Sequence, residues 1–232
     1  MRLLILSDIH GELENLEKLS EEFKTADLVL FGGDFTKFNE IETGLPTLKA
    51  LTDKHDSIFA VTGNCDNPDL IEEMENADIS IQKTLVFRDG LVFIGSGGAL
   101  KFTGTTPNER TDEDLVSDFN IIFEQTQENS EPDLWRNLIV IMHQPPKNTN
   151  CDTISTGIHV GSELLRDFIE QIQPLLVVTG HIHEAASIDT IGKTLIINPG
   201  SLAEGNYGII EITKQNEEWI ITDSKLQNIA TK

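Results

Sequence analysis

The stretch LLILSDIH (residues 3–10) joins a short apolar run to two ligand-type side chains, Asp8 and His10. Four consecutive apolar residues bounded by polar ones predict a short buried β-strand over residues 3–6. Residues 12–23 then carry leucines at helical spacing, which predicts an amphipathic helix. A strand followed by a helix is the unit of an α/β protein, and the same pattern recurs along the chain.

Further apolar runs predict the other elements. Strands are predicted at residues 28–31, 58–61, 138–142 and 175–179, and helices at residues 41–51, 111–128 (with Thr111 as N-cap) and 162–172. Residues 85–87 and 91–94 flank the pair Asp89-Gly90, which is typical of a hairpin turn, and residues 97–107 predict a loop. Residues 187–191, 194–197, 207–212 and 219–222 predict successive antiparallel strands. Without an internal repeat or linker, residues 1–232 are predicted to form one domain.

The composition limits the classes of partner. Asp and Glu number 39 against 17 Lys and Arg, so the formal net charge is −22. Proteins that clamp a long nucleic acid need clustered basic residues, and this balance indicates against such a partner. The ordinary meaning of the acidity is a strongly solvated surface. If the substrate carries a phosphate, metal ions are the expected source of attraction.

The same composition indicates a cytoplasmic protein. No apolar run approaches the ~18 residues that cross a bilayer, so we expect neither a membrane span nor a membrane partner. Cys65 and Cys151 are the only cysteines, which does not indicate a disulfide framework.

Ligand-type side chains follow five of the predicted strands. They are Asp8 and His10, Asp34, Asn64, His143, and His181 with His183. Carboxyl ends of strands in open α/β sheets gather at one rim, so these side chains are expected to meet. Oxygen and imidazole ligands suit Mn²⁺, Fe, Co²⁺ or Zn²⁺ better than Ca²⁺. Seven ligands suit two ions that share a carboxylate, an arrangement that serves in-line displacement at phosphorus.

Each motif alone has an ordinary explanation. A single Asp-x-His after a strand is most often a cap or turn, and a single histidine is most often a core or surface residue. The conjunction favours a metal site, because four of the six histidines stand at strand ends beside carboxylates. The i, i+2 spacing of Asp8 with His10, and of His181 with His183, also lets each pair face one side of extended backbone.

At these positions the sequence resembles the calcineurin-like metallophosphoesterase family, in particular its small bacterial and archaeal phosphodiesterase branch. The family motifs read here as Asp8-Ile9-His10, Gly33-Asp34, Gly63-Asn64-Cys65-Asp66, His143 and Gly180-His181-Ile182-His183, and the branch is matched at Gly157-Ile158-His159-Val160-Gly161-Ser162 and Asn198-Pro199-Gly200-Ser201. The resemblance implies a four-layer α/β fold, with two mixed β-sheets packed face to face between helices. It also implies a metal-dependent hydrolase whose nucleophile is a hydroxide that bridges two metal ions.

The resemblance assigns the ligands as well. One metal takes Asp8, His10, Asp34 and His183, and the other takes Asp34, Asn64, His143 and His181. Asp34, Asn64 and His143 are thereby the expected catalytic residues. Mn²⁺ is expected first, with Fe, Ni, Co and Zn as alternatives, because availability often decides among such metals.

Three further residues have an expected place beside the metals. Cys65 stands where many family members carry a histidine, and a thiol is a poor substitute for an imidazolium acid. Small phosphodiesters are therefore expected substrates in preference to monoesters, with nucleotides among the candidates. Asp66 is expected either to orient a neighbour of the metals or to stabilise its turn. His159 is expected either to face the substrate phosphate or to lie at the surface.

A non-catalytic interaction scaffold on the same fold, like the retromer subunit, is the alternative function. A pure scaffold has no need of all seven ligand groups, which favours the enzyme. A nuclease of this superfamily would need a basic surface, and a homodimer is expected only by analogy to the branch.

Overall fold

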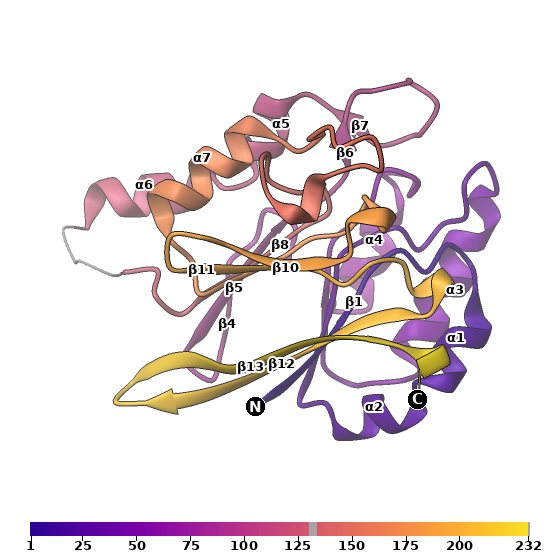
Figure 1. Cartoon of the computed structure of the whole chain (residues 1–232), viewed down its shortest axis with the longest axis horizontal. Coiled ribbons are helices and arrows are strands. Elements are labelled where there is room, and N and C mark those ends of the chain that lie inside the picture. The colour runs from indigo at the N-terminus through magenta and orange to yellow at the C-terminus, as the bar shows by residue number, and fades with distance from the viewer. Residues whose placement is uncertain (130–133, 232) are drawn as a thin grey trace.

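The computed structural model describes residues 1–129 and 134–231. Two β-sheets pack face to face, and helices cover the outer face of each sheet (Figure 1). The predicted four-layer arrangement is thus confirmed.

The first sheet has the strand order β13-β12-β1-β2-β3. Its strands are β1 (Arg2–Leu6), β2 (Leu28–Phe31), β3 (Ile58–Ala60), β12 (Asn206–Gln215) and β13 (Glu218–Asn228). The strands β1, β2 and β3 are parallel to one another, whereas β12 runs antiparallel to β1 and to β13. The turns with the first three predicted ligands therefore lie at the same end of this sheet, where β1, β2 and β3 have their carboxyl ends.

The second sheet has the strand order β10-β11-β9-β8-β5-β4. Its strands are β4 (Val86–Arg88), β5 (Leu91–Ser96), β8 (Leu138–Met142), β9 (Leu176–Val178), β10 (Ser187–Ile191) and β11 (Thr194–Asn198). The strands β5, β8, β9 and β11 are parallel, and the two outer strands are antiparallel to their neighbours. Two short strands, β6 (Ala99–Leu100) and β7 (Glu109–Arg110), pair separately within the segment predicted as a loop and just after it.

Strand β1 shows why its residues form a strand buried on both faces. Leu3 and Ile5 point into the core between the sheets, and Leu4 and Leu6 point into the core beneath the helices. Alternate side chains of a strand face opposite sides, so a strand covered on both sides must be apolar at every position. The uninterrupted apolar run at the N-terminus follows from this requirement.

Seven α-helices lie outside the sheets in the described residues. The first sheet is covered by α1 (Leu13–Lys18), α2 (Ser20–Thr25), α3 (Gly44–Thr52) and α4 (Leu70–Asn76), and the second by α5 (Asp112–Ser117), α6 (Asn120–Glu128) and α7 (Glu163–Ile172). None of them is long and apolar enough to cross a membrane.

Three sequence predictions of local structure need correction. The helix predicted over residues 12–23 is broken at Leu19, and the helix predicted to run to residue 128 is broken at Asp118 and Phe119. Helix α4 was not predicted. The four C-terminal strands do not form one antiparallel series, because β10 and β11 join the second sheet and β12 and β13 the first.

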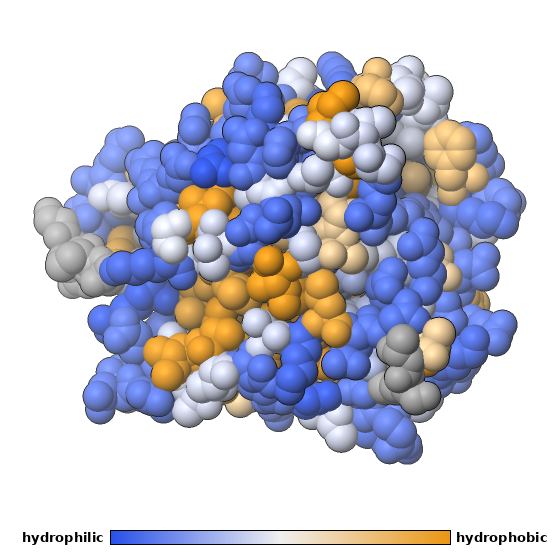
Figure 2. All heavy atoms as spheres, in the orientation of Figure 1, coloured by the Kyte–Doolittle hydropathy of each residue, from blue (hydrophilic) through white to orange (hydrophobic). Residues whose placement is uncertain are grey.

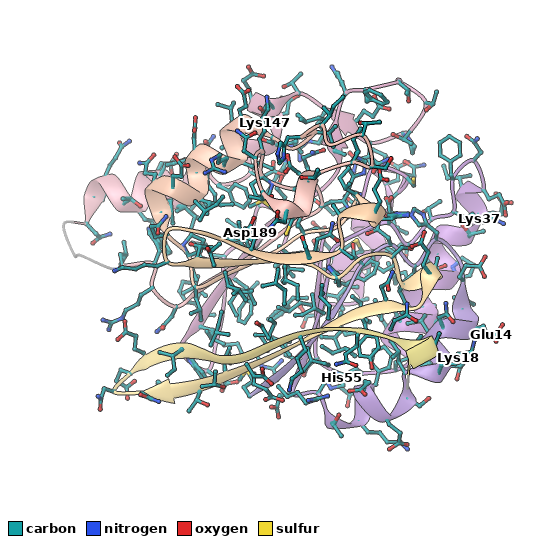
Figure 3. The ribbon with its side chains drawn as sticks, in the orientation of Figure 1. Glu14, Lys18, Lys37, His55, Lys147 and Asp189 are labelled. Atoms are coloured by element: carbon teal, nitrogen blue, oxygen red, sulfur yellow. The ribbon has the colours of Figure 1, made fainter. Side chains whose placement is uncertain are left out.

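The face of the molecule seen in Figure 2 is mostly polar and carries an apolar strip. Figure 2 shows this strip between β10–β11 and β12–β13, where the space between the two sheets reaches the surface. Its half-buried side chains include Ile188, Leu195, Ile221 and Leu226, which pack on the inner core. Charged side chains such as Glu14 and Lys18, an ion pair at 2.8 Å, project from the helical layer (Figure 3).

Candidate metal centre

The predicted ligands lie in turns that follow five strands from both sheets. Strands β1, β2 and β3 lead to the turns with Asp8, Asp34 and Asn64, and strands β8 and β9 lead to His143 and His181. The site therefore spans the ends of both sheets. We call the seven predicted ligands together the ligand cluster: Asp8, His10, Asp34, Asn64, His143, His181 and His183.

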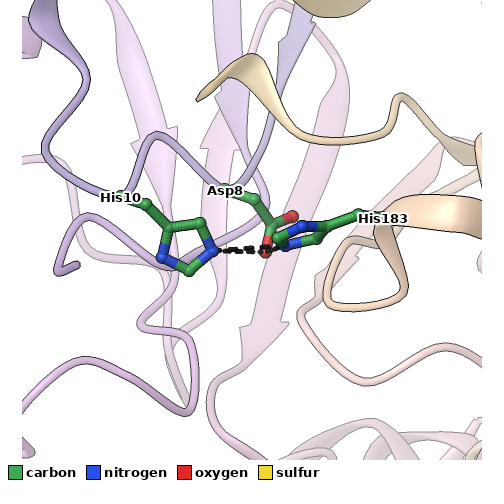
Figure 4. A group of neighbouring side chains, drawn as sticks. All are labelled: Asp8, His10 and His183. Carbon is green, nitrogen blue, oxygen red and sulfur yellow. Dashed lines mark hydrogen bonds and ion pairs between the residues drawn. The ribbon is translucent and has the colours of Figure 1, made fainter. Parts of the chain in front are cut away.

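One half of the ligand cluster is centred on Asp8. The Nε2 atom of His183 lies 3.2 Å from Asp8 Oδ1, and the Nε2 atom of His10 lies 3.7 Å from the same oxygen (Figure 4). The two Nε2 atoms are 3.2 Å apart. Three ligand atoms from the first and last motifs of the chain thus converge on one point.

The other half is centred on Asp34. Its Oδ2 atom lies 3.6 Å from His10 Nε2 and 3.5 Å from His143 Nε2, while its Oδ1 atom accepts a hydrogen bond from Cys65 N at 2.8 Å. The Nε2 atom of His143 lies 3.0 Å from Asn64 Oδ1. Asp34 therefore stands between the two halves, with a histidine on each side.

Two backbone carbonyls orient the rings of His10 and His143. The Nδ1 atom of His10 lies 2.8 Å from Thr36 O, and that of His143 lies 2.7 Å from Gly32 O. A carbonyl accepts only, so each Nδ1 carries the proton and donates. This hydrogen bond leaves Nε2 facing the carboxylates as the ligand atom, the arrangement usual for metal-binding histidines.

The pKa values show how charge is shared within the cluster. Burial lowers the pKa of His10 and of His143, but Asp8 and Asp34 outweigh burial and raise both to about 9. Burial would raise the pKa of Asp8, but the rings of His10 and His183 bring it well below its usual value. Burial and then neighbouring His143 lower the pKa of His181 to about 4. The carboxylates thus hold protons on nearby imidazoles, in places that a divalent cation would take.

The backbone of the cluster is in the left-handed region at four non-glycine residues: Asp8 (φ 55°), His10 (φ 48°), Asp34 (φ 62°) and His181 (φ 66°). Each such residue costs about 1–3 kcal/mol, which the surrounding structure must offset. The turns after β1 and β2 support each other, because Asp8 N donates to Gly33 O at 2.9 Å and His10 N donates to Asp34 O at 3.1 Å. Strain of this kind is characteristic of functional sites.

A scan of protein families matches residues 1–185 to the model described as calcineurin-like phosphoesterase. The chain belongs to the calcineurin-like phosphoesterase family. It is therefore a phosphoesterase, a hydrolase of phosphate esters. An uncharacterized protein of Methanocaldococcus jannaschii is 30% identical over 205 residues, covering 86% of this chain and 88% of that protein.

Solved structures share the fold. The protein TT1561 of Thermus thermophilus superposes with a TM-score of 0.72 at 18% identity, covering 98% of both chains. A structure described as a novel archaeal phosphodiesterase superposes with a TM-score of 0.54 at 18% identity, covering 98% of this chain and 100% of that one.

Asp66 holds the turns of this phosphoesterase in place. Its buried carboxylate accepts hydrogen bonds from the backbone N–H groups of Asp34 (3.0 Å), Phe35 (3.3 Å), Thr36 (2.9 Å) and Gly63 (2.8 Å). Of the two roles expected for Asp66, the structure shows the turn-stabilising one.

The glycines of the family motifs leave space for carboxylate oxygens. A Cβ atom on Gly63 would lie 1.9 Å from Asp34 Oδ1, and one on Gly180 would lie 2.7 Å from Asp8 Oδ2. Both distances are far below van der Waals contact, so any larger residue would displace a ligand.

Sequence reasoning missed the buttress formed by Asn198 and Ser201, which it used only for the resemblance. Ser201 Oγ donates to Asp8 O at 2.8 Å, and Asn198 Nδ2 donates to Ile182 O at 2.9 Å. These bonds tie the turn after β11 to both the first and the last motif. Only the sequence motif itself signalled them, because the partners lie far away along the chain.

The remaining predicted residues lie as follows. The ring of His181 is 5.2 Å from that of His143, between centroids. The Sγ atom of Cys65 lies close to the ligand atoms of His10 and Asp34. Burial, and after it the negative charge of Asp34, raises the pKa of this thiol far above its usual value. The Nδ1 atom of His159 lies 2.7 Å from Asp152 Oδ1, so this ring braces its own loop.

Proposed function

We propose that this phosphoesterase holds two divalent transition-metal ions and hydrolyses small phosphodiesters by in-line displacement. The position of Asp34 carries the proposal. Its carboxylate lies between His10 and His143 and belongs to both halves of the ligand cluster, as a bridging ligand must.

The donor set fits such ions. Groups of ligand atoms from Asp8, His10 and His183, and from Asp8, Asp34 and His143, lie within 4.8 Å of one another. Carboxylate oxygens and imidazole nitrogens are the ligands that Mn²⁺, Fe, Co²⁺, Ni²⁺ and Zn²⁺ accept, and we propose Mn²⁺ first. When bound, two such ions would acidify a water molecule and polarise the phosphoryl oxygens.

We propose the ligand sets that the family resemblance implies. One ion would take Asp8, His10, Asp34 and His183, and the other would take Asp34, Asn64, His143 and His181. The buried carbonyl anchors of His10 and His143 fix the ring directions before any ion binds. Asn64, whose Oδ1 lies beside His143 Nε2, would add a neutral oxygen ligand.

Cys65 supports the preference for diesters. A monoester with a poor leaving group needs a proton donor near the leaving oxygen, and a buried thiol with a raised pKa is a weak acid. The fold shared with a structure described as an archaeal phosphodiesterase is consistent with this choice.

The test is hydrolysis by chelator-stripped protein, with and without Mn²⁺, of bis-p-nitrophenyl phosphate and p-nitrophenyl phosphate. We expect hydrolysis only with metal and faster on the diester. Cys65→His should leave diester hydrolysis intact and raise hydrolysis of a monoester with a poor leaving group, such as glycerol phosphate, measured as released phosphate. Cys65→Ser is the matched control without an imidazole.

No hydrolysis of either ester with any transition metal would overturn the proposal and favour the scaffold. Unchanged monoester hydrolysis in Cys65→His would show that Cys65 does not set the preference. A nucleotide substrate, a homodimer and a cytoplasmic location stay predictions.

A further inference from the structure

A cavity of about 560 Å³ opens directly beside the ligand cluster. Asn64 and His181 form the part of its wall that belongs to the cluster, and Phe38, Phe102 and Ile154 are among its apolar residues. We call it the aromatic cavity. Cavities of about 300–1,000 Å³ hold small organic ligands, so it has room for one ring system attached to a phosphate.

One polar side chain of the aromatic cavity, that of Gln144, is already engaged within the protein. Gln144 accepts a hydrogen bond from Leu100 N at 3.0 Å through Oε1 and donates to Val160 O at 3.1 Å through Nε2. Gln144 thereby joins the segments of Leu100 and Val160, both of which line the cavity. The lining also includes Lys101, but most of it is apolar, with Phe38, Leu100, Phe102, Ile154 and Val160 among its residues. A wall of this kind favours an apolar occupant.

Glu109 fixes the loop that carries Phe102. Its carboxylate accepts hydrogen bonds from Phe102 N (3.0 Å), Gly104 N (2.9 Å) and Thr106 Oγ1 (3.0 Å). The aromatic side chain therefore stands on a backbone that is held before any ligand arrives. Pre-organisation of this kind lowers the entropic cost of binding.

Phe102 and Phe38 expose their rings at the aromatic cavity. Phe102 is 93% exposed and Phe38 is 50% exposed, and neither ring stacks on another aromatic ring in the part of the chain that the structure describes. Exposed aromatic rings beside a polar reaction centre are typical of surfaces that bind a ring of a ligand.

A neighbouring cavity at the ligand cluster has a different character. A second cavity of about 300 Å³ is lined by His183, Glu184 and Glu204, and it shares Ile154, His181 and Ile182 with the aromatic cavity. Two carboxylates at this wall repel a second phosphate group. The larger cavity with Phe38 and Phe102 is therefore the better place for a bulky apolar substituent.

We propose that the substrate is a phosphate ester with an aromatic substituent, whose ring lies in the aromatic cavity against Phe38 and Phe102. The inference rests on the proposed function, because the cluster must bind the phosphoryl group. It names the class of ester: aryl or nucleobase-bearing esters are preferred over alkyl esters and over esters with a second phosphate.

The test measures the affinity of phenylphosphonate and of methylphosphonate for the full chain loaded with Mn²⁺, by titration calorimetry. Both ligands present the same anionic group, so their ratio reports the aromatic cavity. We expect phenylphosphonate to bind about tenfold more tightly. Phe102→Ala should reduce this ratio to about twofold and leave methylphosphonate binding unchanged. Glu109→Ala, which frees the loop, should also reduce it.

Phe87→Ala is the matched control, because Phe87 is 71% exposed on strand β4, at the edge of the second sheet. It should keep the full ratio. Equal affinity for the two phosphonates, or a ratio that survives Phe102→Ala, would overturn this inference while leaving Mn²⁺-dependent hydrolysis in place. Binding of neither phosphonate together with no hydrolysis would overturn the proposed function and this inference with it.

Discussion

At the scale of single residues, protons and metal ions compete for the same atoms. The Nε2 atoms of His10 and His143 face the carboxylates of Asp8 and Asp34 at 3.5–3.7 Å. Without a metal these rings keep a proton to well above neutral pH, because the carboxylates need a positive partner. A metal ion that binds the same nitrogens must displace those protons, so its affinity increases with pH.

The stability of the metal-free protein should therefore fall as pH rises. The pKa of His10 and of His143 is raised from 6.5 to about 9, so their stabilising charge is complete below pH 6.5 and is lost as pH rises through about 9. Saturating Mn²⁺ replaces that charge. We expect it to raise Tm by about 5–10 °C at pH 9, and by less at pH 6.

Calorimetric melting with chelator and with Mn²⁺ at the two pH values checks this expectation. His55→Gln is the control, because His55 lies beside α2 (Figure 3) and its ring contacts the carbonyls of Ala26 and Ser57 rather than a residue of the ligand cluster. An equal metal-induced shift at both pH values would show that protons on the cluster do not compete with the ion.

At the scale of elements, the grouping of the predicted ligands could be foreseen because each stands just after its strand. The apolar run and the polar turn after it are local features, so β1, β2 and β8 and the polar residues that follow them could be recognised from sequence. The helix break at Asp118 could not, because the contacts of this residue in the folded chain accompany it. Asp118, at the break after α5, is fully buried and binds Arg110 at 2.6 Å and Ser96 at 2.9 Å, which overrides the helical periodicity.

The sheet to which each C-terminal strand belongs could not be predicted from the sequence either. The turns around β10–β13 predict strands well, but nothing local tells which sheet each strand joins. The aromatic cavity was missed for the same reason, because Phe38 and Phe102 are far apart in the sequence and line one cavity only in the folded chain.

Asp66 connects the turn after β2 with the turn after β3, and its removal should lower the stability of the protein. Asp66→Ala leaves four buried N–H groups without their acceptor, which we expect to destabilise the protein by about 3 kcal/mol or more and to weaken metal binding. Urea unfolding of the metal-free protein measures the first effect. Asp69→Ala is the control, because Asp69 is exposed in the same segment and caps no N–H group of α4 with its side chain. Similar losses in both variants would contradict the role given to Asp66.

At the scale of the whole molecule, the strong negative charge opposes the approach of an anionic ester. The net charge of −22 produces a repulsive field that salt screens over about 10 Å at 0.1 M ionic strength. Attraction must come from the bound ions at short range. The field of the whole protein therefore repels an anionic ester, whereas ions bound at the ligand cluster would attract it.

We expect kcat/KM for a diester anion to increase a fewfold between low ionic strength and 0.2 M, at fixed Mn²⁺. Most phosphate-binding proteins with basic surfaces would show a decrease. Steady-state rates in NaCl and in a second monovalent salt check the expectation, since a specific ion effect would differ between the two salts. A decrease in both salts would show that local attraction outweighs the field of the whole molecule.

The central claim is a two-metal centre in which Asp34 binds both ions. Its most direct test is the number of Mn²⁺ ions per chain, by elemental analysis after loading and removal of free metal, in the natural protein and in Asp34→Asn. We predict two ions per chain in the natural protein, and at most one in Asp34→Asn together with a loss of diester hydrolysis of more than about 100-fold. A natural protein that saturates at one ion, or an Asp34→Asn variant that keeps two ions and its full rate, would contradict the account.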